Sequence, residues 1–216
     1  MIGDHTVHIV LLHGLGANGD DLAPIGRMLG ESLGEDAALP DLKFKVHAPD
    51  ALVAPVTINN GYLMPSWFDI YGLDRDAPVD EAGIASSVAR IAALIDAKVG
   101  AAPCVLAGFS QGGVIALRAA CAVKRAPIGV LLLSTWLPAA DRFVLPEDRK
   151  SMPIFIGHGE QDDVVPVASA ARMTHVLNAA GAKRVETHFY TMAHQICPEQ
   201  MQDMSQFLAS VVAQPK

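Results

Sequence analysis

Charged and aromatic residues are both scarce in this sequence. Charged residues make up 18% of the 216 positions and aromatic residues 6%. Acidic residues outnumber basic ones by 23 to 16, which gives a net charge of −7. Nucleic acids and anionic membranes bind basic surfaces, so we expect neither as the main partner. No run approaches the roughly 18 apolar residues of a membrane span, so we expect no integral membrane association.

Cysteine is also scarce, and the usual metal-binding spacings are missing. The three cysteines are Cys104, Cys121 and Cys197, and no C-x-x-C or H-E-x-x-H motif occurs. We therefore expect no metal site. Cys104 and Cys121 fall in apolar segments, where a free cysteine packs as a small hydrophobe. Free cysteines, together with a start that lacks a basic leader, predict a cytoplasmic protein.

The sequence does contain a repeated alternation of strand-like and helix-like patterns, and 51% of its residues are hydrophobic. This alternation predicts an α/β fold, with a mostly parallel sheet covered by helices on both faces. We expect a single domain over residues 1–216, no large lid domain, and an irregular segment from Pro49 to Pro78. The expected strands are His8–Leu12, Lys43–His47, Cys104–Ala107, Ile128–Leu133, Pro153–Gly157 and Val185–Tyr190. The expected helices are Asp20–Leu33, Val79–Val99, Gly112–Arg118, Val167–Ala180 and one beginning near Pro198.

The segment Gly108-Phe109-Ser110-Gln111-Gly112 matches the G-x-S-x-G motif between an expected strand and an expected helix. In this context the motif predicts a nucleophile elbow, a sharp turn that exposes the serine at the carboxyl edge of the sheet. Side chains at Gly108 or Gly112 would collide across such a turn. The alternative is an ordinary glycine-rich turn. A nucleophilic serine also needs a base, an orienting carboxylate and oxyanion donors.

In the elbow architecture the carboxylate and then the histidine follow the serine along the chain. An acidic loop, from Glu160 to Asp163, follows the expected strand Pro153–Gly157. His194 follows the last expected strand, where the general base belongs. Of the other histidines, His13 and His158 each precede a glycine at a strand end. We expect those two to form hydrogen bonds with loop backbone near the site.

The oxyanion donors are expected from two backbone positions. One N–H comes from the residue after the serine, Gln111, and the other from an early strand-to-helix loop. The glycine-rich loop His13–Gly19 fits the second position and suggests Leu15. A phosphate-binding loop is the alternative, because glycines also allow close approach to phosphate. The loop satisfies neither G-x-G-x-x-G nor G-x-x-x-x-G-K-[ST], which argues against that alternative.

Five elements together resemble the phospholipase/carboxylesterase family, a group of α/β-hydrolases that includes bacterial carboxylesterases and acyl-protein thioesterases. The resemblance runs in order over nearly the whole chain and implies an α/β-hydrolase fold. It implies an ester or thioester hydrolase with a Ser-Asp-His triad of Ser110, Asp162 (rather than Asp163) and His194, and no cofactor. It also implies that Leu15 and Gln111 donate to the oxyanion. The five elements are His13-Gly14-Leu15-Gly16, Trp67-Phe68-Asp69, Gly108-Phe109-Ser110-Gln111-Gly112-Gly113, His158-Gly159 with Asp162 and Val165-Pro166, and Ala193-His194.

Specificity information is concentrated in two aromatic segments. From the resemblance, Trp67 lies near the acyl pocket, and we expect Leu63, Met64 and Trp136 to contact the substrate as well. The alternative is that these side chains only pack against the end of the sheet. We predict a serine carboxylesterase acting on short- to medium-chain acyl esters. An acyl-protein thioesterase, a lysophospholipase, a non-catalytic binding module and a homodimer are left open.

Overall fold

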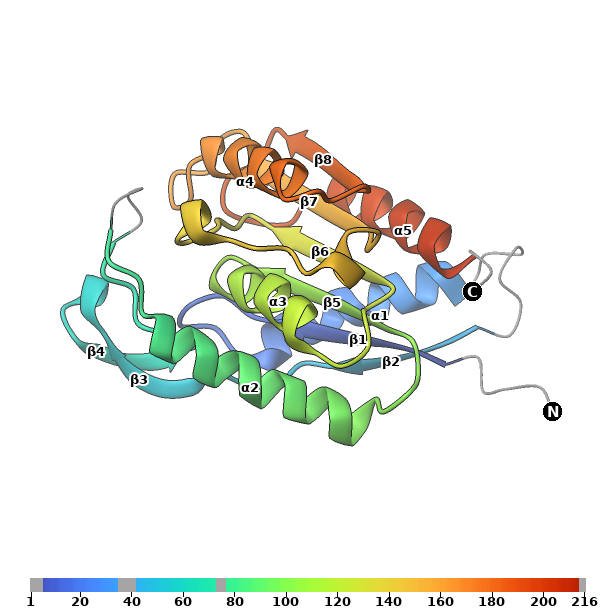
Figure 1. The fold of residues 1–216 in the computed structure, drawn as a ribbon, viewed down its shortest axis with the longest axis horizontal. Coiled ribbons are helices and arrows are strands. Elements are labelled where there is room, and N and C mark those ends of the chain that lie inside the picture. The colour runs from blue at the N-terminus through green and yellow to red at the C-terminus, as the bar shows by residue number, and fades with distance from the viewer. Residues whose placement is uncertain (1–5, 35–41, 73–76, 214–216) are drawn as a thin grey trace.

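A six-stranded parallel sheet runs through the middle of the molecule (Figure 1). The computed structural model describes residues 6–34, 42–72 and 77–213. The strand order is β2-β1-β5-β6-β7-β8, and each predicted strand is present. The strands are β1 (Thr6–Leu12), β2 (Lys43–His47), β5 (Cys104–Phe109), β6 (Gly129–Leu133), β7 (Ile154–Gly159) and β8 (Val185–Tyr190).

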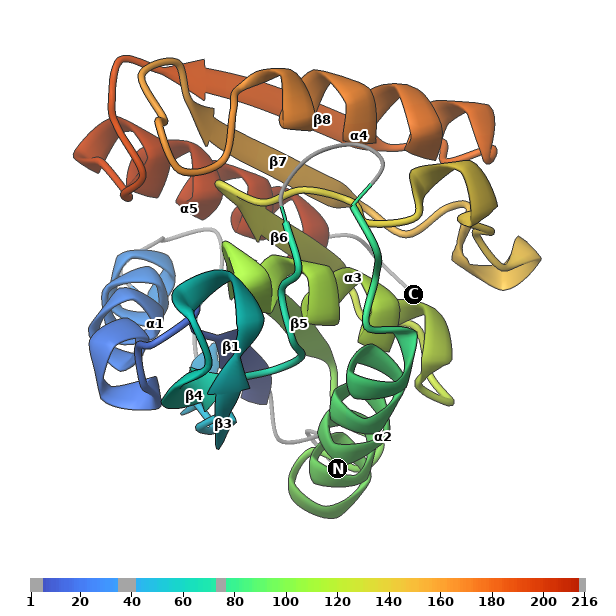
Figure 2. The ribbon, with the colours of Figure 1, turned by 90° about the vertical axis from the view of Figure 1, so that its left-hand side faces the viewer.

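Helices cover both faces of this sheet, as the alternating pattern predicts (Figures 1 and 2). Because successive strand residues point to opposite faces, Val10 and Leu12 pack with α2, α3 and α4, whereas Ile9 and Leu11 pack with α1 and α5. None of the described helices is long and apolar enough to cross a membrane. The helices are α1 (Gly19–Gly34), α2 (Glu81–Lys98), α3 (Gln111–Ala122), α4 (Ala168–Ala179) and α5 (Pro198–Val212).

The segment that we expect to be irregular contains a β-hairpin, which corrects the prediction. Strands β3 (Leu52–Val56) and β4 (Tyr62–Ser66) pair antiparallel, and a short 3₁₀ turn (Thr57–Asn59) joins them. Asn60 and Gly61 close the connection with φ angles of 55° and 75°. The dipeptide Asn-Gly is a strong hairpin signal, because both residues tolerate positive φ. Residues 73–76 of the same segment lie outside the described residues.

Two prolines explain why the strand pattern of the hairpin is hard to recognise. Pro55 lies in β3 and Pro65 in β4, and proline cannot donate a ladder hydrogen bond. In the register of the hairpin Pro55 pairs with Leu63, and Pro65 pairs with Val53. A two-stranded sheet tolerates proline because each strand has one edge at which no other strand pairs.

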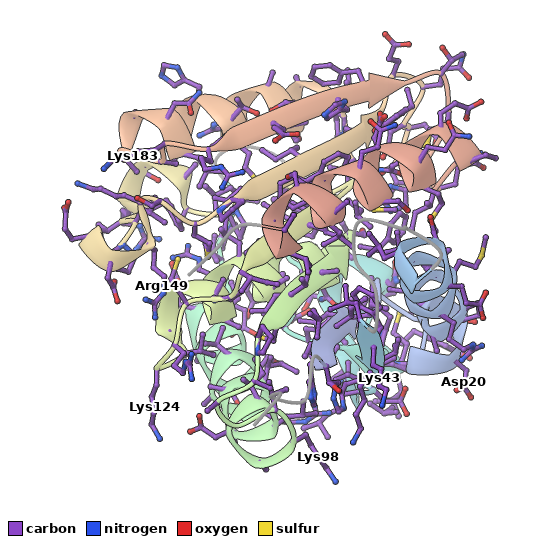
Figure 3. The ribbon with its side chains drawn as sticks, turned by 90° about the vertical axis from the view of Figure 1, so that its right-hand side faces the viewer. Asp20, Lys43, Lys98, Lys124, Arg149 and Lys183 are labelled. Atoms are coloured by element: carbon purple, nitrogen blue, oxygen red, sulfur yellow. The ribbon has the colours of Figure 1, made fainter. Side chains whose placement is uncertain are left out.

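The hairpin lies at the end of the main sheet toward which the parallel strands point (Figures 1 and 2). The carboxyl ends of β1, β5 and β7 therefore share this end of the molecule with it. At the opposite end, Lys43, Lys98, Lys124 and Lys183 extend to solvent (Figure 3). The predicted site residues are thus separated from these four cations by the length of the sheet.

Candidate active site

Ser110 occupies the turn between β5 and α3, in the strand-turn-helix context that the motif requires. Its φ of 52° and ψ of −121° are unusual for a residue with a side chain. A Cβ on Gly108 would lie 2.2 Å from the Gly112 carbonyl oxygen, across the turn. A Cβ on Gly112 would instead lie 2.1 Å from the Leu12 carbonyl oxygen of β1. Glycine at these positions therefore lets the turn close and also lets it pack against the neighbouring strand.

Ser110 opens into a cavity of about 500 Å³ at the carboxyl end of the sheet. Only 8% of the residue is exposed, so the serine is recessed in the cavity rather than exposed as expected. Leu15 and His194 line the same cavity. Small-molecule sites usually have volumes of about 300–1,000 Å³, and this cavity lies within that range.

His194 and Asp162 form a hydrogen-bonded pair beside this cavity. The distance from His194 Nδ1 to Asp162 Oδ2 is 2.7 Å, and the Asp162 side chain is fully buried. The other carboxylate oxygen, Oδ1, accepts hydrogen bonds from the backbone N–H groups of Val164, at 3.0 Å, and Val165, at 2.7 Å. The neighbouring Asp163 is exposed. The loop therefore presents Asp162, rather than Asp163, to the imidazole.

The hydrogen bond to Asp162 determines which ring nitrogen of His194 can act as a base. A carboxylate oxygen accepts hydrogen bonds, so Nδ1 carries a proton, and in the neutral ring the lone pair is on Nε2. Among the described residues no hydrogen bond joins Ser110 to His194, although both line the cavity. Such contacts are often long without substrate and tighten when it binds. The Phe109 ring supports the imidazole, with 4.7 Å between ring centroids.

His158 lies next to Asp162 of this pair. Its side chain is fully buried, and Nε2 donates to the Val165 carbonyl oxygen at 2.8 Å. The same nitrogen lies 3.4 Å from Asp162 Oδ2. Burial lowers the pKa of His158, which favours the neutral ring. The expected hydrogen bond to loop backbone is present, and it supports the loop that carries Asp162.

The two expected oxyanion donors are both available. In the described part of the chain, neither the Leu15 N–H nor the Gln111 N–H has a hydrogen-bond acceptor. Gln111 is the first residue of α3, where backbone N–H groups point out of the helix end. A Cβ on Gly14 would lie 3.4 Å from Ser110 Cβ, so the loop that carries Leu15 packs directly on the serine.

The Gln111 side chain forms hydrogen bonds that connect the elbow to the end of β4 and the residues that follow it. Its Oε1 accepts the Trp67 N–H at 3.0 Å. Its Nε2 donates to Ser66 Oγ at 2.9 Å and to the Phe68 carbonyl oxygen at 2.7 Å. Gln111 therefore combines a free backbone N–H with a fully used side chain, a feature that the motif alone does not indicate.

The structure places three of the four expected substrate contacts outside the described cavity lining. Trp67 is 2% exposed, and its Nε1 donates to the His13 carbonyl oxygen at 2.8 Å, so it lies in the core. The sulfur of Met64 accepts a hydrogen bond from Asn59 Nδ2. Leu63 is 63% exposed on the hairpin surface. None of these three side chains is among the described residues that line the cavity, whereas Trp136 is.

Most of the cavity wall is apolar and comes from positions that the motifs do not mark. Ile58 follows β3, Ile70 follows the Trp67 segment, and Val164 follows Asp162 along the chain. No periodic pattern distinguishes these residues from ordinary surface positions, so sequence reasoning missed them. The described lining residues are Gly14, Leu15, Ala17, Asp21, Leu22, Ile58, Asn59, Ile70, Phe109, Ser110, Trp136, Val164, Val165 and His194.

The position of Trp67 changes what its replacement should do. Trp67→Ala should lower the free energy of unfolding by about 3–5 kcal/mol, because it leaves a cavity in a packed core. Any loss of kcat/KM should be equal for short and long acyl chains, since Trp67 does not line the cavity. Urea unfolding and a chain-length series measure the two effects. Tyr62→Ala, at a site that is 70% exposed, serves as the control. A loss of kcat/KM confined to longer acyl chains would instead indicate that Trp67 lines the acyl pocket.

Metal-binding geometry is also missing from the described residues. In the ranges 6–34, 42–72 and 77–213, no group of three or more His, Cys, Asp or Glu side chains could hold a metal ion. The residues around Ser110 are hydrogen-bonded to one another or to backbone instead.

Comparisons with known proteins agree with this geometry. A family model described as Phospholipase/Carboxylesterase matches residues 2–212. Acyl-protein thioesterase 1 of Cryptococcus neoformans is 34% identical over 227 residues, covering 94% of this chain and 92% of that protein. SOBER1 of Arabidopsis thaliana has a similar structure, with a TM-score of 0.83, 27% identity, and coverage of 96% of this chain and 99% of that one. Acyl-protein thioesterase 2 of Zea mays also has a similar structure, with a TM-score of 0.81, 29% identity, and coverage of 98% of this chain and 96% of that one.

These matches confirm the α/β-hydrolase fold and the resemblance noted in the sequence. The family match spans almost all of the described sheet and helices. The similar structures cover nearly the whole chain. The chain therefore belongs to the phospholipase/carboxylesterase family of serine ester hydrolases.

Proposed function

We propose that this protein hydrolyses short- to medium-chain acyl esters through an acyl-enzyme intermediate on Ser110. His194 is the general base and Asp162 the carboxylate that orients it. The observation that carries the proposal is the 2.7 Å hydrogen bond between His194 Nδ1 and Asp162 Oδ2, beside the cavity that Ser110 and His194 share. The free N–H groups of Leu15 and Gln111 further support it, because an acyl-transfer site needs donors for the oxyanion.

In the first half of the reaction, Ser110 Oγ attacks the acyl carbonyl carbon while His194 Nε2 takes the hydroxyl proton. Asp162 stabilises the imidazolium through its hydrogen bond to Nδ1. The N–H groups of Leu15 and Gln111 stabilise the negative charge on the former carbonyl oxygen. The intermediate then collapses, and the leaving alcohol or thiol takes the proton from His194.

In the second half, water replaces the serine as the nucleophile. His194 again removes a proton, this time from the water that attacks the acyl-enzyme carbonyl carbon. Collapse of this intermediate returns the proton to Ser110 and releases a carboxylic acid. Apart from this water, every step uses groups of the chain itself, so the proposal requires no cofactor.

The apolar cavity wall supports an acyl group as the part of the substrate that binds there. Each methylene that enters an apolar site contributes about 0.8 kcal/mol, which corresponds to about a fourfold rise in kcat/KM. We expect this rise over the first acyl carbons and a plateau or fall once the chain extends beyond the cavity. Long-chain triglycerides should be poor substrates.

Trp136 should contribute to this chain-length profile, because it lines the cavity beside Ile70 and Ser110. Trp136→Ala should flatten the increase in kcat/KM with chain length and leave acetyl-ester hydrolysis comparatively unchanged. The measurement is kcat/KM for p-nitrophenyl esters of two carbons upward. Leu63→Ala is the matched control, because Leu63 lies outside the described cavity lining. An equal loss at every chain length would contradict a role for Trp136 in acyl binding.

A thioester leaving group is the second candidate, and similarity to proteins named acyl-protein thioesterase favours it. Matched oxygen esters and thioesters with the same acyl chain separate the two. A similar kcat/KM for both series would mean that the acyl group determines selection. A thioester preference above tenfold would assign the protein as a thioesterase. Hydrolysis of neither, with no fluorophosphonate labelling of Ser110, would leave only a binding role for the scaffold.

A further inference from the structure

The imidazole of His13 is held by two hydrogen bonds that together fix its protonation. His13 is fully buried at the end of β1. Its Nδ1 lies 2.7 Å from the Gly14 carbonyl oxygen, and its Nε2 lies 2.9 Å from the Ala51 backbone nitrogen. A carbonyl oxygen can only accept and a backbone N–H can only donate. His13 must therefore be neutral, with its proton on Nδ1 and its lone pair on Nε2.

The hydrogen bond from Nδ1 also fixes the direction of the Leu15 N–H. The Gly14 carbonyl and the Leu15 N–H belong to the same peptide unit, which is planar and trans. In such a unit the C=O and N–H bonds point in opposite directions. Ala17 N–H donates to the same carbonyl oxygen at 3.2 Å. Holding this oxygen on one side directs the Leu15 N–H to the other side.

We propose that His13 is a positioning residue of the oxyanion hole. Its neutral Nδ1–H form holds the Gly14–Leu15 peptide so that the Leu15 N–H faces the reacting carbonyl beside Ser110. This inference rests on the proposed ester hydrolysis and extends it to a residue that does not contact the substrate. Preorganised donors are effective because they need no reorientation as charge develops on the oxygen.

The surroundings of His13 keep the required tautomer. Protonation of Nε2 would place two N–H groups against each other, because Ala51 already donates to that nitrogen. Burial lowers the pKa of His13, and Arg90 acts in the same direction, whereas the Gly14 hydrogen bond, Asp50 and Asp21 oppose the shift. The net result favours the neutral ring.

The backbone of His13 is anchored as well as its ring. Trp67 Nε1 donates to the His13 carbonyl oxygen at 2.8 Å, and the Trp67 N–H is held by the Gln111 side chain. His13 therefore connects the loop that supplies one oxyanion donor to the residue that supplies the other. A displacement of the ring should consequently affect the reaction rate more than substrate binding.

Two substitutions separate the two hydrogen bonds of the ring. In His13→Asn the amide nitrogen can take the place of Nδ1 and donate to Gly14, but nothing replaces Nε2. In His13→Gln the amide oxygen can take the place of Nε2 and accept from Ala51, but nothing replaces Nδ1. We expect His13→Gln to lower kcat by about tenfold or more with little change in KM. Complete loss of an oxyanion donor costs about 10²–10³ in kcat, which sets the upper limit. We expect His13→Asn to retain most of the wild-type kcat.

A purely structural role for His13 would not give this contrast, since both variants lose one hydrogen bond of a buried ring. Thermal unfolding of both proteins is the control for stability. Equal kcat losses in the two variants, or a change confined to KM, would overturn the inference. Ring ¹⁵N NMR of wild-type His13 at neutral pH tests it without substitution. The expected signal is a neutral ring protonated on Nδ1, and a ring protonated on Nε2 or on both nitrogens would overturn the proposal.

These outcomes are distinguishable from failure of the proposed function. If wild-type protein neither hydrolyses p-nitrophenyl esters nor reacts with a fluorophosphonate, ester hydrolysis on Ser110 fails, whatever the tautomer of His13. If wild-type protein does both, but His13→Gln and His13→Asn have the same kcat, only the positioning role fails.

Discussion

Ser110→Ala and His194→Ala should each abolish nearly all ester hydrolysis while the protein stays folded. Residues of a Ser-Asp-His triad act as a unit, and loss of the serine or the histidine costs on the order of 10⁶ in kcat in a comparable site. The double variant should therefore be little slower than either single variant. Rates of p-nitrophenyl ester hydrolysis for the three variants measure this. Additive losses in the double variant would contradict a shared mechanism.

The chain offers matched controls for both substitutions. Ser134 is also a buried serine with positive φ, at the end of the neighbouring strand β6, and its φ is 44°. Its hydroxyl has no hydrogen-bond partner among the described residues, and it does not line the cavity. Ser134→Ala should leave kcat unchanged. His175→Ala, on the exposed side of α4, is the corresponding control for the imidazole.

Asp162→Asn should lower kcat by a factor on the order of 10⁴, whereas Asp163→Asn should change it little. The amide of an asparagine can donate to Nδ1 of His194. The ring proton then lies on Nε2, so Nε2 cannot act as the base. In a comparable triad this change of tautomer lowers kcat by about 10⁴. The exposed position of Asp163 gives its carboxylate no comparable contact. Steady-state kinetics of the two variants gives the comparison directly.

The same pair of variants separates catalysis from loop stability. The amide oxygen of an asparagine at position 162 can still accept from Val164 and Val165, so the loop should keep its shape. Similar thermal unfolding of Asp162→Asn and the wild type would support this. If Asp163→Asn proves the more damaging change, the hydrogen bond between Asp162 and His194 is not the one that matters for turnover.

The parallel sheet could be predicted from the sequence, because its central strands are short apolar runs, its edge strands β2 and β8 alternate, and helical patterns separate most of them. The elbow is recognisable from its two glycines, because a Cβ at Gly108 or Gly112 would lie only 2.2 Å or 2.1 Å from a backbone carbonyl oxygen. His194 follows from its place after the last strand. In each case local sequence and backbone sterics favour the same conformation.

The β3–β4 hairpin could not be predicted so easily. Pro55 and Pro65 argue against strands in general, and only the turn at Asn60 and Gly61 indicates the hairpin. The turn signal therefore outweighs two residues that are normally unfavourable in a sheet. Because each of the two strands pairs with another strand on one edge only, a proline can occupy the other edge without loss of strand pairing.

The substrate side of the site depends on tertiary packing. Trp67 is apolar enough for either an acyl pocket or a core, and only its contacts with Gln111 and His13 place it in the core. Conversely, Ile58 and Val164 line the cavity because two distant loops meet at the sheet end. Sequence spacing carries no information about such a meeting.

The most direct test of the proposed mechanism is to identify the residue that a fluorophosphonate modifies, by peptide mass spectrometry, while ester hydrolysis is followed in the same sample. We expect one adduct, on Ser110, formed in step with loss of activity. Ser110→Ala protein should form none. An adduct on another residue, or full hydrolytic activity after Ser110 is modified, would contradict the account.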